Sequence, residues 1–277
     1  MKPPFIDGNM VHSFVEQVHT NIIHHIWFQG VDKVPEPYHT NMRQCARMNH
    51  NWKHNVWSGD MLRKECYTFS NACGRMFDEY EIMHQKIDLG RYVVVCRYGG
   101  ISLDGDAVCL RRLSEMPFSK RKITVTSFDL TWVERVVSGL ALNNATIYSP
   151  YPNHPSMIRL VDQIVARGSG KHMSNHIWRV NQTTGPSAFQ KIVESLPDVE
   201  IASGKLFEPC VVNDCNSDSN TFIEHRHTGT WLDGVPNLIR LTYGRVRPFG
   251  RMIGTALMIT FLIVFAILSV EQVRKLL

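Results

Sequence analysis

Short apolar runs alternate with segments of helical hydrophobic spacing through the first 202 residues of the chain. The apolar runs predict strands near residues 22–28, 54–57, 101–104, 123–127, 145–148 and 199–202. The helical patterns predict helices near residues 61–79, 87–97, 131–140, 155–167 and 187–195. Because the two kinds of element alternate, the pattern predicts an α/β fold built on a doubly wound, mostly parallel sheet.

Two segments break this alternation. Residues 203–222 are rich in Asn, Asp and Ser, which predicts a loop, one of a length usually found over a ligand site. Residues 252–270 form a run of 19 residues without a charge, apolar on all sides. Such a run is long enough to cross a hydrocarbon core of ~30 Å as a helix. The second segment therefore predicts a single C-terminal transmembrane helix.

The expected organisation follows from these patterns. It comprises an N-terminal extension (1–20), one globular domain (21–240), a basic juxtamembrane segment (241–251), the transmembrane helix (252–270) and a short tail (271–277). Residues 1–20 lack the apolar core of a signal peptide. The arginines before the span predict a tail-anchored membrane protein whose domain faces the cytosol. The alternative is the lumen of the Golgi or the endoplasmic reticulum, because glycosylation sequons begin at Asn144 and Asn181.

Composition agrees with one α/β core. The chain has 277 residues, of which 44% are hydrophobic and 20% charged. The net charge of +5 is modest, and the scattered basic residues exclude a nucleic-acid-binding stripe. The 7 cysteines are odd in number and scattered, which favours reduced thiols. Cys210 and Cys215 leave two alternatives open, half of a zinc site or a loop disulfide.

The richest chemistry lies in residues 98–106, Tyr-Gly-Gly-Ile-Ser-Leu-Asp-Gly-Asp. The short strand in this segment delivers Asp104 and Asp106 to its carboxyl end, where α/β proteins bind ligands. The glycines, Gly99 and Gly100 among them, allow the backbone to approach a ligand closely. Paired carboxylates bind Mg²⁺ or Mn²⁺ and leave positions for phosphate oxygens. This segment therefore predicts a metal and diphosphate site.

Three further groups of residues support such a site. Asp88 and Arg91 are spaced i, i+3 and share a helix face, either as a surface ion pair or as contacts to a sugar and its phosphates. His225 and His227 alternate on an extended segment, so one of them can reach the metal or phosphate. Asp129, after the predicted strand 123–127, is a spare carboxylate.

The order of these residues resembles a known family. The landmarks are Ile22–Phe28, Trp52, Trp57, Asp88–Tyr92, Tyr98–Asp106, Asn143–Ala145, His154–Pro155, Thr184–Ser187 and His225–Trp231. Together they resemble the Asp-x-Asp sugar-binding glycosyltransferases of family 32. That family includes α-mannosyltransferases and inositolphosphoceramide mannosyltransferases, and it is distantly similar to the clostridial glucosylating toxins. The resemblance covers most of residues 20–232.

The resemblance implies a GT-A fold that binds a nucleotide-sugar donor, UDP- or GDP-hexose, together with Mn²⁺ or Mg²⁺. It implies catalytic roles for Asp88, Arg91, Asp104 and Asp106. The donor would contact Trp27, Asp88, Arg91, Tyr98, Gly99, Gly100, Asp104, Gly185, Thr230 and Trp231. The metal would be bound by Asp104 and Asp106, with His225 or His227 nearby. The sequence departs from the family pattern at two positions. Gly105 stands where the family commonly has Thr or Ser, and Thr230 stands where it has Ser.

The predicted function is thus a metal-dependent, retaining glycosyltransferase that moves a hexose to a glycan, lipid or protein acceptor. One alternative is a lipid mannosyltransferase of the inositolphosphoceramide type. Another is a non-catalytic, membrane-tethered interaction module, against which the intact Asp88, Arg91, Asp104 and Asp106 count.

Overall fold

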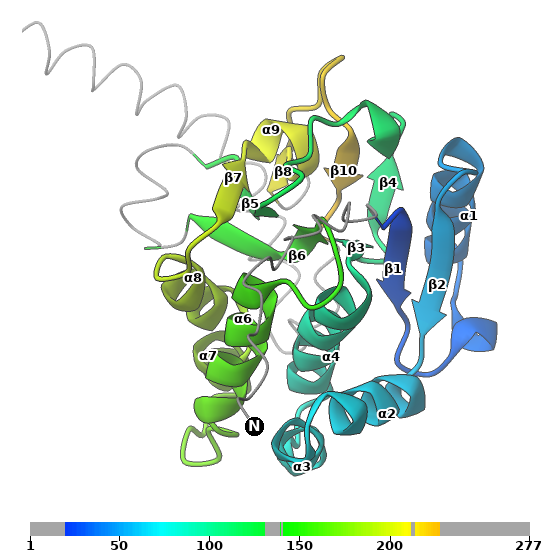
Figure 1. Cartoon of the computed structure of the whole chain (residues 1–277). Helices are drawn as coiled ribbons and strands as arrows, with labels where there is room; N and C mark the ends of the chain where they lie inside the picture. Colours follow the sequence, from blue (N-terminus) through cyan, green and yellow to red (C-terminus); the bar gives the residue numbers. More distant parts are fainter. Residues whose placement is uncertain (1–19, 131–138, 140, 212–213, 228–277) are drawn as a thin grey trace, which may run out of the picture.

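A six-stranded sheet forms the centre of the computed structural model, which describes residues 20–130, 139, 141–211 and 214–227 (Figure 1). The strand order is β2-β1-β3-β6-β5-β7. The bounds are β1 Ile22–Ile26, β2 Lys53–Trp57, β3 Gly100–Ser102, β5 Ile123–Ser127, β6 Leu142–Ser149 and β7 Val199–Ala202. Strand β6 runs antiparallel to β3 and β5, and the other pairs are parallel. The predicted mostly parallel sheet is confirmed, with one reversed strand.

Helices cover both faces of this sheet. Six of them contribute to one hydrophobic cluster or pack beside it: α2 Gly59–Phe69, α3 Asn71–Glu79, α4 Met83–Tyr98, α6 Pro155–Ala166, α7 His176–Thr183 and α8 Pro186–Val193. The second cluster receives α1 Tyr38–Met48 and α9 Gly204–Phe207. Neighbouring strand residues point to opposite faces, so Ile147 belongs to the first cluster and Tyr148 to the second.

Short elements stand at the edge of the sheet from which Asp104 leaves β3. They are η1 Val31–Lys33, β4 Ala107–Cys109, η2 Leu113–Glu115, β8 Cys210–Val211, β9 Asp214–Cys215 and β10 Ile223–His225. Strands β4 and β10 form an antiparallel ribbon, and β8 pairs with β9. In Figure 1 strands β4, β8 and β10 lie with α9 in the upper part of the molecule, away from α2 and α3. The ribbon brings a late part of the chain beside residues 104–107.

Helix α4 is the central helix of the first cluster. It is buried along most of its length, including the polar side chains of Asp88 and Arg91. It ends at Gly99, whose φ of 65° suits glycine better than any other residue. The chain then enters β3 directly, so α4 and β3 together place Asp88, Arg91 and Asp104 near one another.

Several elements differ from the sequence-based expectation. The predicted helix 61–79 is two helices, because Ser70 has extended backbone and its Oγ accepts a hydrogen bond from the Cys73 N–H at 3.1 Å. The predicted loop 203–222 contains α9, β8 and β9. Helices α1 and α7 were not predicted. The predicted helix 131–140 lies outside the described residues, apart from position 139.

The expectation of reduced cysteines is wrong for four of the seven. Cys45 is bonded to Cys109 and Cys210 to Cys215, while Cys66, Cys73 and Cys96 are buried free thiols. Cys45 on α1 and Cys109 on β4 are brought together only by packing, and their separation in sequence hides the pair. Of the two alternatives for Cys210 and Cys215, the structure has the loop disulfide.

The membrane architecture also needs correction. Within the described ranges, no helix has both the length and the apolar character that crossing a membrane requires. The longest, α4, has 16 residues, about 24 Å, and carries buried charges. The predicted span at residues 252–270 lies outside the described residues. We therefore withdraw the C-terminal anchor as part of the fold, and with it the membrane localisation and orientation inferred from that span.

Candidate active site

Asp104 and Asp106 lie in the tight turn between β3 and β4. The turn is closed by the Ala107 N–H, which donates to the Asp104 carbonyl at 3.1 Å. Helix α1 supports it from outside, since the Asn41 side chain donates to the Gly105 carbonyl at 3.2 Å. The Asp106 side chain is nearly buried, whereas that of Asp104 is 31% exposed. The turn thus holds one carboxylate inside the fold and the other at its surface.

Strand β10 brings His225 to these carboxylates. His225 pairs with Ala107 across the β4–β10 ribbon. Its Nε2 lies 3.1 Å from Asp106 Oδ1 and 3.5 Å from Asp104 Oδ2. One ligand atom from each of these three residues falls within 4.8 Å of the others. Two carboxylates and an imidazole in this arrangement fit a divalent cation such as Mn²⁺ or Mg²⁺.

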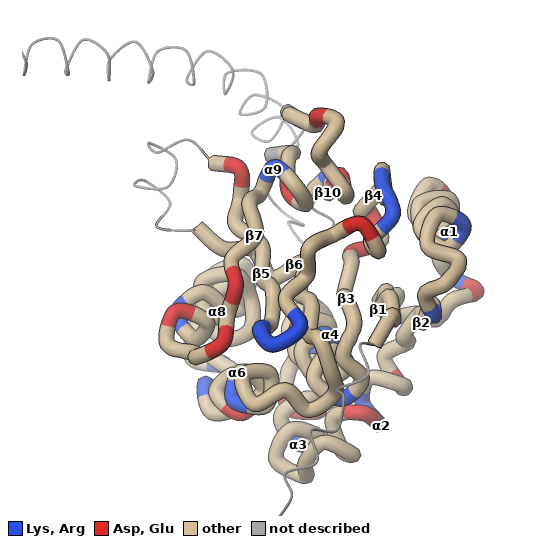
Figure 2. The backbone as a smooth tube through the Cα atoms, turned by 45° about the horizontal axis from the view of Figure 1, so that its top comes forward, with Lys and Arg blue, Asp and Glu red and all other residues tan. Residues whose placement is uncertain are grey.

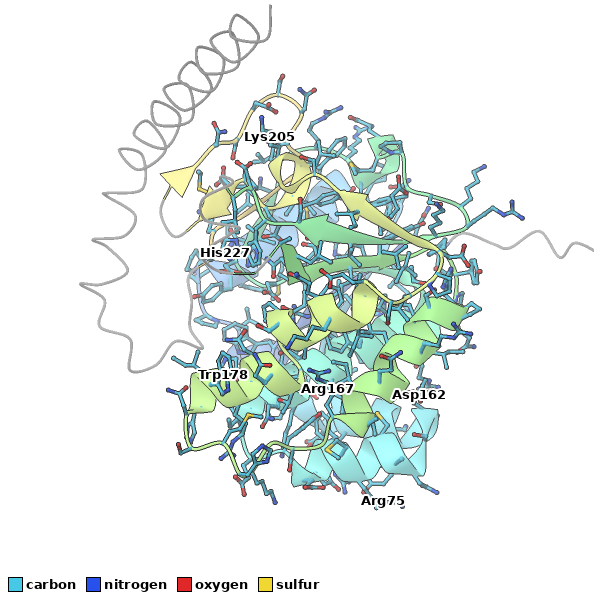
Figure 3. The ribbon with its side chains drawn as sticks, turned by 90° about the vertical axis from the view of Figure 1, so that its left-hand side faces the viewer. Arg75, Asp162, Arg167, Trp178, Lys205 and His227 are labelled. Carbon is cyan, nitrogen blue, oxygen red and sulfur yellow. A yellow bond between two sulfur atoms is a disulfide. The ribbon has the colours of Figure 1, made fainter. Side chains whose placement is uncertain are left out.

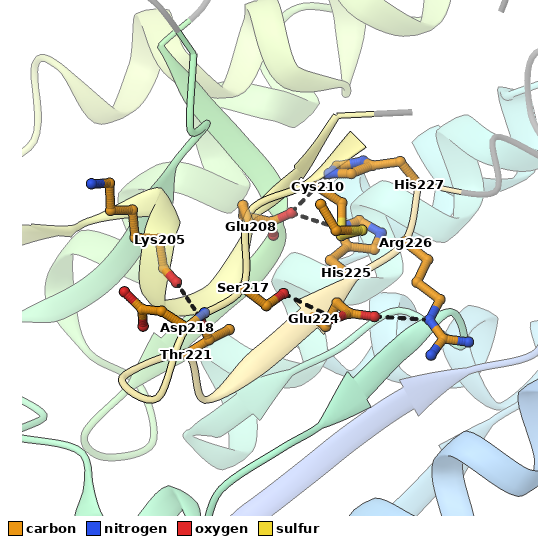
Figure 4. The surroundings of a disulfide bond; sticks show 11 residues. Lys205, Glu208, Cys210, Ser217, Asp218, Thr221, Glu224, His225, Arg226 and His227 are labelled. Carbon is orange, nitrogen blue, oxygen red and sulfur yellow. Dashed lines mark hydrogen bonds and ion pairs between the residues drawn. A yellow bond between two sulfur atoms is a disulfide. The ribbon is translucent and has the colours of Figure 1, made fainter. Parts of the chain in front are cut away.

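Glu208, which follows α9, orients the two histidines. Its Oε2 lies 2.7 Å from His225 Nδ1 and 3.1 Å from His227 Nε2 (Figure 4). Its other oxygen accepts a hydrogen bond from Thr146 Oγ1 at 3.1 Å. The His225 and His227 rings lie 4.0 Å apart. Because Glu208 holds Nδ1 of His225, the Nε2 of that ring faces Asp106, as in the carboxylate–histidine pairs of metal sites.

Burial and charge compete in this cluster. Burial alone would raise the pKa of Glu208, but the charge of His225 and the hydrogen bonds from both histidines lower it to about 2. Burial alone would lower the pKa of His225, yet Glu208 and Asp106 raise it well above 6.5. Binding of a metal ion through Nε2 would therefore require His225 to lose a proton.

Asp88 and Arg91 continue the site along α4. Arg91 binds the Asp104 carboxylate through Nη2 and donates through Nη1 to the Asn144 carbonyl at 2.7 Å. Asp88 accepts hydrogen bonds from Asn144 Nδ2 at 2.9 Å and from Thr184 Oγ1 at 3.1 Å. Of the two alternatives for this pair, the surface ion pair is excluded by burial. The guanidinium thus links the Asp104 turn to Asn144, whose side chain donates to Asp88.

Asp88 is an unusual carboxyl group. Burial raises its pKa to about 7, against the opposing influence of Arg91 and the hydrogen bonds from Thr184 and Asn144. The Tyr92 hydroxyl closes the network, since it accepts from Asn144 Nδ2 at 2.8 Å and donates to the Thr184 carbonyl at 2.6 Å. Strand β6 and the α7–α8 junction thus fix the carboxyl in place from two sides.

Of the other residues predicted to contact the donor, the structure describes Trp27 and Gly185. Trp27, just after β1, is partly buried, with its ring 5.3 Å from that of Tyr38. Gly185 follows Thr184, the partner of Asp88, and is the N-cap of α8. Thr230 and Trp231 lie outside the described residues. Asp129 follows β5, with its backbone against Gly204.

Three predicted donor residues are not brought together with the carboxylates. Gly100 begins β3 and Gly99 precedes it, so both lie at the opposite end of the strand from Asp104, where Gly100 packs on the Ile22 carbonyl. The Tyr98 hydroxyl donates to Glu65 at 2.9 Å. These residues turn the chain from α4 into the sheet.

Sequence reasoning did not select Glu208, Asn144, Thr184 or Tyr92 as site residues. Asn144, Thr184 and Tyr92 stood within landmarks of the family resemblance, which was a usable signal. Glu208 offered none, because it occupies the segment interpreted as a polar loop and acts through contacts made only in the folded chain.

Comparison with known proteins finds similar sequences among glycosyltransferases. Residues 35–123 match the family model described as the glycosyltransferase sugar-binding region containing a DXD motif. The chain is 27% identical to an uncharacterised glycosyltransferase of Acanthamoeba polyphaga mimivirus, over 76% of this chain and 83% of the viral protein. It is 25% identical to inositol phosphoceramide mannosyltransferase 3 of Schizosaccharomyces pombe, over 65% of this chain. That match spans only 47% of the yeast protein.

Solved structures with a partial likeness are also glycosyltransferases. A glycosyltransferase involved in glycosylation of the major capsid of PBCV-1 gives a TM-score of 0.45 at 8% identity, covering 74% of this chain and 92% of the other. The PaToxG glycosyltransferase gives 0.43 at 15% identity, covering 64% and 69%. The family match contains Asp88, Arg91, Asp104 and Asp106. The chain therefore carries the DXD-containing sugar-binding region of this family and is a glycosyltransferase.

Proposed function

We propose that this glycosyltransferase moves a hexose from a UDP- or GDP-sugar to a glycan, lipid or protein acceptor and depends on Mn²⁺ or Mg²⁺. One observation carries the proposal: Asp104, Asp106 and His225 offer three ligand atoms within 4.8 Å of one another. When bound there, the cation would stabilise negative charge on the departing diphosphate. Retention at the anomeric carbon rests on the family resemblance.

The residues around the cation would then have separate roles in binding and orienting it. Asp106 and His225 hold the cation from the buried side, and Glu208 keeps His225 in the required orientation. Asp104 adds a carboxylate at the surface, where Arg91 limits its movement. Such a rigid set of ligands favours one position of the metal-bound phosphates over others.

Asp88 and Arg91 would bind the donor sugar. Both are oriented by Asn144, through its side chain and its carbonyl respectively. A carboxyl with a pKa of about 7 can accept or donate a hydrogen bond near neutral pH, which suits a hydroxyl of the sugar. Trp27 would border the base, and Gly185, Thr230 and Trp231 would complete the donor site.

A lipid acceptor is the second candidate, because curated relatives are named inositol phosphoceramide mannosyltransferases. In that case the sugar would be mannose and the acceptor a phosphosphingolipid headgroup. Since this chain spans about half the length of those relatives, 47% and 50%, acceptor identity stays a proposal.

The test is donor turnover by the full chain with a panel of UDP- and GDP-hexoses in Mn²⁺, Mg²⁺ or EDTA. We expect one donor to be hydrolysed or transferred only with metal, and Asp106→Asn to lower that rate by on the order of 100-fold or more. Asp162→Asn, an exposed carboxylate on α6, is the matched control and should keep the wild-type rate. Turnover that persists in EDTA would overturn the metal dependence.

A further inference from the structure

A groove of about 780 Å³ lies between α1 and the segment that follows β4. Its two walls are joined by the Cys45–Cys109 disulfide. They are also joined by a hydrogen bond from Gln44 Nε2 to the Cys109 carbonyl at 3.0 Å. The groove is therefore a fixed part of the fold, and its volume is in the range of small-molecule sites.

Four guanidinium groups line this groove, those of Arg43, Arg47, Arg111 and Arg112, against the single carboxylate of Glu115. Figure 2 shows basic positions on α1 and beside β4. Arg43 is paired with Glu36 at 3.0 Å, and Arg111 with Glu115 at 2.9 Å.

Arg47 and Arg112 differ from the other two. Both are exposed, and no carboxylate within the described part of the chain forms an ion pair with either. Four like charges around one groove repel one another, so an anion placed among them relieves an existing cost. Guanidinium groups bind phosphate oxygens through paired hydrogen bonds.

The groove also has an apolar part. Met48 lines it from α1 and Leu110 from the other wall, and Leu110 is 38% exposed. Phosphate alone would use only the arginines, whereas an organic phosphate can also cover these apolar side chains. The lining thus fits a ligand with both kinds of surface.

The groove is separate from the proposed donor site yet connected to it through α1. Asn41 and Met42, near the start of the helix, contact Gly105 of the metal-binding turn. Arg47 lies six residues beyond Asn41, about 9 Å along the helix axis. A ligand in the groove therefore shares its helix with the turn that carries Asp104 and Asp106.

We propose that this groove is a second anion site, which binds an organic phosphate through Arg47 and Arg112. Arg43 and Arg111 contribute as they exchange their carboxylate partners for the ligand. The shared chemistry is a phosphate ester, either on a soluble sugar or polyol or on a lipid headgroup.

The test uses the full chain, in EDTA, with inositol hexakisphosphate as the soluble probe and calorimetry as the readout. Arg47→Glu with Arg112→Glu should weaken binding at least about tenfold. Lys64→Glu with Arg75→Glu makes the same charge change at exposed positions of α2 and α3, and it should change binding less than about twofold. Figure 3 shows Arg75 at the end of the molecule away from His227 and Lys205.

A second variant, Arg47→Gln with Arg112→Gln, removes charge without introducing repulsion and should also weaken binding. Equal losses in groove and control variants, or no loss in either, would overturn the proposal. Sedimentation with vesicles of phosphatidylcholine, with and without phosphatidylinositol phosphate, distinguishes a lipid ligand from a soluble one. Binding to the phosphorylated vesicles that the groove variants lose assigns a lipid ligand, and binding of the soluble probe alone assigns a soluble one.

Donor turnover by the groove variants is measured in parallel. None of the substituted arginines contacts the metal-binding carboxylates, so metal-dependent donor hydrolysis should persist in these variants. If the groove does not bind the phosphate probe, the proposed transferase activity is unaffected. If no donor is hydrolysed, the proposed anion site is equally unaffected.

Discussion

At the scale of single residues, Glu208 acts on the cluster through the two histidines that it contacts. It is fully buried and serves both His225 and His227. We expect Glu208→Gln to weaken Mn²⁺ binding about 10- to 100-fold, because the amide keeps the shape and loses the charge that orients His225. Titration calorimetry checks this. Glu200→Gln, at an exposed position of β7, is the control, and equal affinities in the two variants would contradict the role.

Asn144 is the second residue that acts through others. Its side chain bonds Asp88 and Tyr92. We expect Asn144→Ala to lower the free energy of unfolding by about 1–3 kcal/mol, since it leaves buried polar groups without a partner. It should also lower kcat/KM for the donor by about tenfold or more. Asn181→Ala, which breaks only a bond within α7, should leave kcat/KM unchanged. A loss of stability with normal kinetics would show that Asn144 only supports the fold.

Because of Asp88, the free energy of unfolding should decrease as the pH rises. Its pKa is raised from 3.8 to about 7, so folding favours the protonated form. The stabilising contribution is complete below about pH 4 and is lost as the pH rises to about 7. The difference in unfolding free energy between the wild type and Asp88→Asn should therefore fall by up to about 1.4 kcal/mol per pH unit across that window. Urea denaturation at several pH values measures it, and a constant difference would refute the shifted pKa.

Residue-level prediction from sequence related residues to one another where they are local in the chain and missed the contacts that form only in the folded protein. Asp104 and Asp106 share one turn, and Asp88 and Arg91 share one helix, so their spacing alone relates them. Glu208 meets His225 only after β10 pairs with β4, and nothing in its neighbours signals this. Strand direction separates Gly99 and Gly100 from Asp104, although the sequence joins them within one motif.

At the scale of elements, α9 depends on a close approach to β5. A Cβ on Gly204 would lie 2.5 Å from both the Ser127 carbonyl oxygen and the Asp129 nitrogen. Gly204→Ala should therefore push α9 and Glu208 outward, lowering the melting temperature by several degrees and weakening Mn²⁺ binding. Ser203→Ala, at the neighbouring exposed position, makes no such contact and should be close to neutral. Differential scanning calorimetry distinguishes the two.

Predicted elements show the same limits. The six sheet strands were found because their apolar runs are distinct, and β5 and β7 match to the residue. The reversed direction of β6 could not be predicted, since alternation carries no information about orientation. Helix α1 was missed because its first residues, Tyr38 to Gln44, are largely polar and only Asn41, Met42 and Cys45 are buried.

At the scale of the whole molecule, the Cys45–Cys109 bond closes a large loop that contains β2, α2, α3, α4 and β3. The sequence separation is 64 residues, for which loop closure contributes about 4 kcal/mol of stability. Cys45→Ala with Cys109→Ala should lower the urea midpoint accordingly. Cys210→Ala with Cys215→Ala, across a separation of 5, should cost about half as much. A larger loss in the second variant would contradict this ranking.

The pairing of β4 with β10 also determines when, during translation, His225 can join Asp104 and Asp106. Asp104 and Asp106 are translated about 120 residues before His225, which at 5–20 residues per second is roughly 6 to 24 seconds. During that interval the nascent chain already carries the carboxylate turn but not the imidazole that completes the cluster, nor Glu208. A ribosome-bound intermediate therefore carries an incomplete carboxylate–imidazole cluster. The full set of proposed ligands therefore forms only when the ribbon closes.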